Sequence, residues 1–80
     1  MSQEQRQAFA VAQNLRNLAR LHAEAQRYPT ALSLYDESVK WAKRANGFHD
    51  ASDFIQILTR ERAALRQQET MEQAAAIGGG

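Results

Sequence analysis

Two helical patterns, joined by a short hinge, occupy residues 15–42 and constrain this chain more than any other feature. Small residues stand where two antiparallel helices would touch, with Ala19 in the first pattern and Ala31 and Ser38 in the second. Larger side chains surround these positions, as expected at a close helix crossing. The pattern therefore predicts a helical hairpin, a unit that buries its faces by packing against other elements.

The two helices of the hairpin have recognisable limits. The first is expected from Gln3 to Ala25, because apolar residues recur along it at steps of three and four. The second is expected from Pro29 to Ala45, since proline suits the first helical turn. Asn46-Gly47 would then provide the left-handed stop.

The second helix is apolar over roughly half of its circumference at about 100° per residue. A helix that touches one neighbour needs a narrower stripe. We therefore expect this helix to contact two neighbours and to lie in the middle of the packing.

A third helix is expected to begin near Asp50 or Ser52, either of which suits the N-cap, and to run to about Glu69. Residues 73–77 could extend it before the glycines of the C-terminus. The sequence thus predicts an all-α, three-helix domain over residues 1–72, followed by a flexible Ala/Gly tail over residues 73–80. The expected core is Leu18, Ala19, Ala31, Leu32, Tyr35, Val39 and Leu58.

Length and charge narrow the classes of function. An 80-residue chain without cysteine has a thin core and no disulfide, so it is expected to be marginally stable or to depend on a neighbour. The net charge of +1 and pI of about 8.2 argue against a dedicated nucleic-acid domain, which is usually more basic. We expect neither a signal peptide nor a membrane-spanning segment.

No arrangement of residues is typical of an active site. His22 lies on the apolar stripe of the first helix and is expected to be a packed core residue, and His49 lies in a loop beside Asp50. Two histidines without cysteine cannot form a structural zinc site. We therefore expect no enzyme activity, no catalytic residue, no metal and no cofactor.

Trp41 is the residue most open to a functional interpretation. It follows Leu34 by seven residues, so the two stack on one side of the second helix. The third helix could cover them, or they could form a partner-binding surface, where exposed aromatic residues concentrate binding energy. The candidate partner contacts are Leu34, Trp41, Phe54 and Ile57.

The hairpin resembles a tetratricopeptide unit. Leu15, Leu18-Ala19, His22, Tyr28, Ala31, Tyr35 and Ser38 occupy the positions that this family fills with large, small and aromatic residues in turn. His22 stands where an aromatic residue is usual, and Ser38 where alanine is usual. The proline that closes the unit is missing, with Lys43 near that position.

A narrower resemblance covers residues 18–77. Residues 31–36 (ALSLYD), 39–42 (VKWA), 54–55, Arg62 and 73–77 (QAAAI) are similar to the C-terminal region of the 68-kDa subunit of the signal recognition particle. The resemblance implies a structural segment of a ribonucleoprotein, involved in co-translational targeting to the endoplasmic reticulum. It implies the 72-kDa subunit as protein partner and RNA binding through the rest of the parent chain. The implied location is the cytoplasm, with nucleolar and ER-associated pools of the particle.

A competing resemblance is to microtubule-interacting-and-trafficking domains, which are also three-helix units. Residues 28–35 (YPTALSLY) resemble the Y-x-x-A-L-x-x-Y beginning of their second helix. Such domains bind helical tails of membrane-remodelling proteins in grooves beside the third helix. Against this resemblance, the later turns of the third helix carry Arg62, Arg66, Gln67 and Gln68 where leucine and tyrosine are usual.

Overall fold

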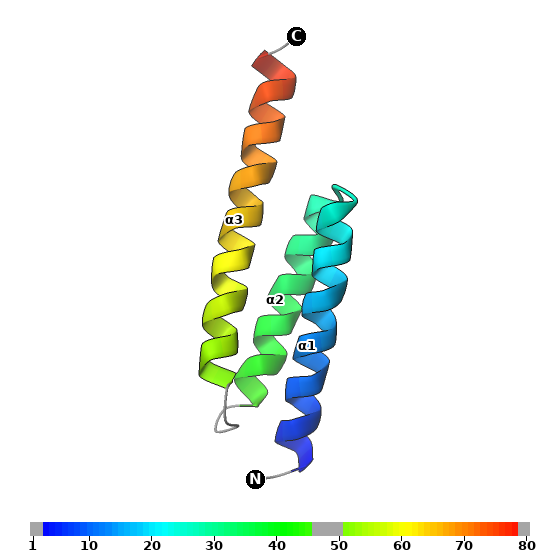
Figure 1. Cartoon of the computed structure of the whole chain (residues 1–80), viewed down its shortest axis with the longest axis vertical. Coiled ribbons are helices and arrows are strands. Elements are labelled where there is room, and N and C mark those ends of the chain that lie inside the picture. The colour runs from blue at the N-terminus through cyan, green and yellow to red at the C-terminus, as the bar shows by residue number, and fades with distance from the viewer. Residues whose placement is uncertain (1–2, 46–50, 79–80) are drawn as a thin grey trace.

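The computed structural model describes residues 3–45 and 51–78, and this part of the chain forms three helices and no strand (Figure 1). The helices are α1 (Gln3–Glu24), α2 (Tyr28–Arg44) and α3 (Ala51–Gly78). The predicted all-α fold with three helices is confirmed. Both helices of the hairpin lie within one residue of their expected limits. The expected helix stop at residues 46–47 lies outside the described residues.

Small side chains allow α1 and α2 to approach closely along their whole length. Ala12, Ala19, Ala31 and Ala42 are completely buried. Ser38 is also completely buried, and its hydroxyl donates a hydrogen bond of 2.6 Å to the carbonyl oxygen of Ala12. The serine side chain is therefore small enough for the narrow gap, and its buried hydroxyl has a hydrogen-bond partner. The predicted packing role of the small residues of the hairpin is confirmed.

The turn between α1 and α2 closes the hairpin without a glycine. Gln26 has a left-handed backbone with φ of 62°. The backbone N–H groups of Gln26 and Arg27 donate to the carbonyl oxygens of Ala23 and His22, each at 2.9 Å. These two bonds form the Schellman motif, in which glycine is the usual left-handed residue. A non-glycine residue at this position carries a steric cost.

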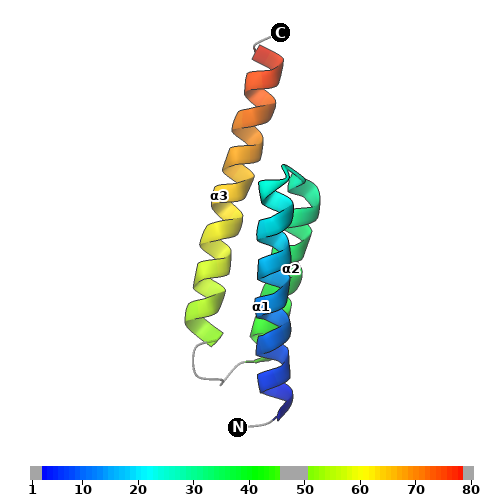
Figure 2. The same cartoon turned by 45° about the vertical axis from the view of Figure 1, so that its right-hand side comes forward.

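The middle position expected for α2 is also confirmed. It packs against both α1 and α3, whereas α1 and α3 scarcely contact each other (Figures 1 and 2). Leu58 and Leu65 of α3 are buried in the same cluster as Leu32 and Tyr35 of α2. Near the start of α3, the ring of Phe54 also lies 5.2 Å from that of Phe9 in α1, between centroids.

The expected end of the third helix near Glu69 is wrong. Helix α3 continues to Gly78 and projects well beyond the hairpin turn (Figure 1). Residues 73–78 therefore belong to the helix and are not the expected flexible tail. The physical reason is the intrinsic preference of the Gln-Ala-Ala-Ala run for helix, with no breaker before the glycines.

Five of the seven residues expected in the core are buried: Ala19, Ala31, Leu32, Tyr35 and Leu58. The other two expectations are wrong. Leu18 is 46 % exposed, because α2 crosses α1 over Ala12 and Ala19 and leaves the Leu18 side uncovered. Val39 is only half-buried and packs at the edge of the core.

The three helices form an elongated body of 55 × 18 × 13 Å with a radius of gyration of 14.6 Å. A compact domain of 80 residues has a radius of gyration of about 12 Å. The projecting part of α3 accounts for the extended shape in the figures. Among the described helices, none combines the length and the apolar character needed to span a membrane.

Candidate functional site

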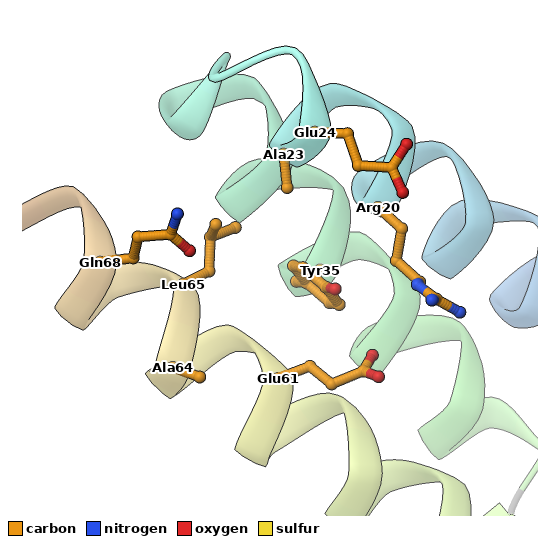
Figure 3. A pocket seen from close by; sticks show the side chains of 8 residues that line it. All are labelled: Arg20, Ala23, Glu24, Tyr35, Glu61, Ala64, Leu65 and Gln68. Carbon is orange, nitrogen blue, oxygen red and sulfur yellow. The ribbon is translucent and has the colours of Figure 1, made fainter.

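A groove between α1 and α3 is one of several hollows on the surface of the described helices (Figure 3). Arg20, Ala23 and Glu24 come from α1, and Tyr35 of α2 lies between the two walls. The α3 wall consists of Glu61, Ala64, Leu65 and Gln68. The hollow has a volume of about 270 Å³. It exists because α1 and α3 each pack on α2 and leave a gap between themselves.

An ion pair between Arg16 of α1 and Glu61 of α3 spans the end of the groove nearest Glu61. The guanidinium of Arg16 donates two hydrogen bonds to the carboxylate of Glu61, with N–O distances of 2.8 and 2.7 Å. Both side chains are about one quarter exposed, at 26 % and 29 %. The hydrogen bonds from Arg16 lower the pKa of Glu61 below its ordinary value of 4.5. The pair therefore fixes the spacing of α1 and α3 where their backbones do not touch.

Tyr35 forms the floor of the groove and is 4 % exposed. Burial, together with the negative charge of Glu61, raises the pKa of its hydroxyl above 10.0. Figure 3 shows the Arg20 and Glu61 side chains extending past the Tyr35 ring from opposite walls of the groove. Arg20 forms no ion pair with another described residue, although its charge also lowers the pKa of Glu61. It is a cation available to a ligand at the groove rim.

The groove continues along the exposed side of α3. Ala64 and Gln68 also line a second hollow of about 510 Å³, together with Gln67, Met71, Glu72 and Ala75. From Glu61 to Ala75 the two hollows follow α3 for about 21 Å, at 1.5 Å per residue. Met71 is 64 % exposed there. The continuous surface is therefore long enough for about four turns of a helix.

A separate cleft of about 500 Å³ lies between the start of α1 and the end of α2. Ala8, Val11 and Trp41 supply its apolar surface, and Glu4, Gln7 and Arg44 supply its polar rim. The guanidinium of Arg44 lies 4.6 Å from the centre of the Trp41 ring, in cation–π geometry. No described residue of α3 lines this cleft.

The four predicted contact residues do not form one surface. Leu34 and Trp41 are half-buried on α2, and Trp41 lines the cleft with α1. Ile57 is 43 % exposed on α3, one turn before Glu61. Phe54 is only 8 % exposed and belongs to the core, so its assignment as a partner contact is wrong. The ring of Phe9 packs beside it in a tilted arrangement.

The α1–α3 groove was not predicted from the sequence. Its defining pair, Arg16 and Glu61, is separated by 45 residues, and each alone reads as part of a solvated helix face. No local signal marks the pair, because other charges lie close by along both helices: Arg20 one turn after Arg16, and Arg60 and Arg62 on either side of Glu61. Only the helix packing brings Arg16 and Glu61 together.

The titratable residues singled out from the sequence are placed by the structure as follows. No group of three or more His, Cys, Asp or Glu side chains that could hold a metal occurs among residues 3–45 and 51–78. His22 is half-buried, and within the described chain its buried Nδ1 atom has no hydrogen-bond partner. His49 and Asp50 lie outside the described residues.

No protein-family model matches the chain, and no curated protein or solved structure matches it either. The resemblances to the signal recognition particle subunit, to tetratricopeptide units and to trafficking domains thus stay predictions.

Proposed function

We propose that the chain is a structural protein-interaction segment that holds a helix of a partner protein in the α1–α3 groove. The observation that carries this proposal is the gap between α1 and α3, which exposes a groove floored by Tyr35 and continued along α3. An amphipathic helix laid in such a groove is a recurring mode of peptide recognition.

The chemistry of the groove suits a helical partner. The small side chains of Ala23, Ala64 and Ala75 allow a close approach of another helix. Met71 adds a flexible apolar contact, of a kind that adapts to different partners. Arg20 offers a charge at the rim, where polar groups set orientation.

The sequence resemblance supports a particular parent and partner. Residues 31–36 and 39–42, which are similar to the 68-kDa subunit of the signal recognition particle, lie on α2. On this proposal the chain is a structural segment of that ribonucleoprotein, acts in co-translational targeting in the cytoplasm, and binds the 72-kDa subunit. RNA is bound through the rest of the parent chain.

Capture of the 72-kDa subunit by the immobilised 80-residue chain tests this proposal. Ala64→Trp fills the groove at the point that both hollows share, whereas Ala63→Trp places the same bulk on an exposed neighbour outside it. We expect Ala64→Trp to abolish capture and Ala63→Trp to retain it. Equal capture by the two variants would exclude the groove, and absence of capture by the wild type would exclude this partner.

A second candidate function is a trafficking-type module. The three-helix fold and a groove beside α3 favour it, together with the Tyr28-to-Tyr35 spacing. Titration of helical tail peptides of membrane-remodelling proteins against isotope-labelled chain tests this function. Chemical-shift changes at Arg20 and Gln68 are expected if it is right, and unchanged spectra would end this interpretation.

A further inference from the structure

The side of the hairpin turned away from α3 carries two apolar stripes. Val11, Leu15 and Leu18 follow one another along α1 at steps of four and three, and Leu34 and Trp41 lie seven residues apart on α2. Both stripes belong to one face, because Val11 and Trp41 line the same cleft. We call this surface, with Glu4 and Arg44 at its rim, the outer hairpin face.

Helix α3 does not cover the outer hairpin face. The contacts of the hairpin with α3 come from other sides of its helices, through Phe9 and Arg16 of α1 and Asp36 of α2. Leu18 is 46 % exposed, although its neighbours on the stripe are half-buried. A leucine and a tryptophan on one uncovered face indicate a surface that associates.

The exposed area of the chain is larger than that of a compact monomer of the same mass. The accessible surface is 5560 Å², whereas a compact monomer of 9.0 kDa exposes about 4,850 Å². The excess is therefore about 700 Å². An interface of standard size buries about 800 Å² on each partner. The excess is close to the area that one partner buries in such an interface, and the projecting end of α3 contributes part of it.

The charged residues at the rim of the outer hairpin face favour a second copy of this chain as the partner. Glu4 and Arg44 lie at the same end of the hairpin, on α1 and α2 respectively, on the rim of one cleft. A two-fold axis parallel to the helices places α1 of one copy against α2 of the other. Glu4 of each copy then faces Arg44 of the other copy, so the dimer contains two pairs of opposite charges.

We propose that a second copy of this chain docks on the outer hairpin face, with the two hairpins parallel in a four-helix arrangement. The hydrogen bond between Ser38 and Ala12 fixes the position of α1 relative to α2 along the helix axes, with residue 38 beside residue 12. Leu34 is consequently level with Leu15, and Trp41 with the first turns of α1. In the dimer, these apolar residues of α2 meet the apolar stripe of α1 in the second copy. The α1–α3 groove of each copy remains open.

Sedimentation equilibrium of the full chain tests the proposal, which is independent of the α1–α3 groove. Across about 1 µM to 1 mM protein, we expect the wild type to approach twice the monomer mass of 9.0 kDa. Glu4→Arg or Arg44→Glu places like charges together at two related positions and raises the dissociation constant about tenfold or more. The double variant Glu4→Arg/Arg44→Glu restores the opposite charges and returns the constant to within about threefold of the wild type.

A second pair of variants separates the outer hairpin face from general surface effects. Leu18→Glu buries two carboxylates in the proposed interface and prevents dimer formation, whereas Met71→Glu changes an equally exposed apolar residue on α3 and leaves the dimer intact. Helix content measured by circular dichroism identifies any variant that fails to fold. A wild type that stays at monomer mass overturns the proposal. A dimer that tolerates Leu18→Glu, or a double charge swap without rescue, overturns it as well.

Discussion

Ala31→Leu probes the close approach of α1 and α2 most severely. Ala31 is completely buried, and leucine would add three carbon atoms where two backbones already limit the space. Overpacking of this kind costs about 1–3 kcal/mol, because side chains leave their preferred rotamers and the backbones must move apart. For a domain of this size, 1 kcal/mol lowers the melting temperature by about 4–8 °C. We therefore expect a decrease of about 10 °C for a cost of about 2 kcal/mol.

Thermal unfolding followed by circular dichroism at a helix band measures this effect. Ala63→Leu is the matched control, because Ala63 is exposed on α3 and the same substitution there changes stability by less than about 0.5 kcal/mol. An Ala31→Leu melting temperature equal to that of the wild type would refute the close packing of the hairpin. A decrease of the same size in Ala63→Leu would show that leucine acts through something other than overpacking.

Three further substitutions test individual contacts. Ser38→Ala removes the buried hydrogen bond to Ala12 and should lower the free energy of unfolding by about 1 kcal/mol in urea titrations; an unchanged midpoint would contradict the contact. Glu61→Gln removes a carboxylate whose pKa Arg16 lowers. The stabilisation by Glu61 is therefore complete above its unfolded pKa of about 4.5 and is lost as the pH falls toward the folded value. The wild type should lose more stability than Glu61→Gln between about pH 5 and 3, and parallel pH profiles of melting temperature would contradict this. Gln26→Gly removes the side chain from a left-handed position. It should increase the free energy of unfolding by about 1 kcal/mol and so raise the melting temperature; a lower melting temperature would show that the turn is not strained.

The hairpin was predictable because its local signals agree with its packing. Pro29 suits the first turn of α2, and the alanine and serine positions fall on the faces that touch. The broad apolar arc of α2 also correctly indicated two neighbours. Here periodicity and residue size point to the same contacts, so no information from distant residues was needed.

The incorrect predictions concern residues whose exposure depends on contacts with distant parts of the sequence. Leu18 lies on the apolar stripe of α1, but the direction in which α2 crosses leaves it 46 % exposed. Phe54 was expected to contact a partner, but it is buried in the core, where the ring of Phe9 packs beside it. The length of α3 was underestimated because its last turns have high helix propensity and continue beyond the hairpin turn.

The candidate site illustrates the same limit. The sequence predicted an interaction scaffold and singled out Trp41, leaving open whether the third helix covers it. In the structure Trp41 is half-buried and lines a cleft between α1 and α2 that no described residue of α3 lines. The α1–α3 groove depends on the gap between two helices that both pack on α2, and on the pairing of Arg16 with Glu61 across it. No local pattern in α1 or α3 contains that geometry.

The central claim is that the α1–α3 groove holds a helix of a partner protein. Its most direct test is amide chemical-shift mapping of the isotope-labelled chain during titration with the 72-kDa subunit. We predict that the largest shifts occur at residues on the two groove walls, such as Arg20, Ala23, Ala64 and Gln68. Shifts confined to Val11, Leu18 and Trp41, or spectra that do not change, would contradict the claim.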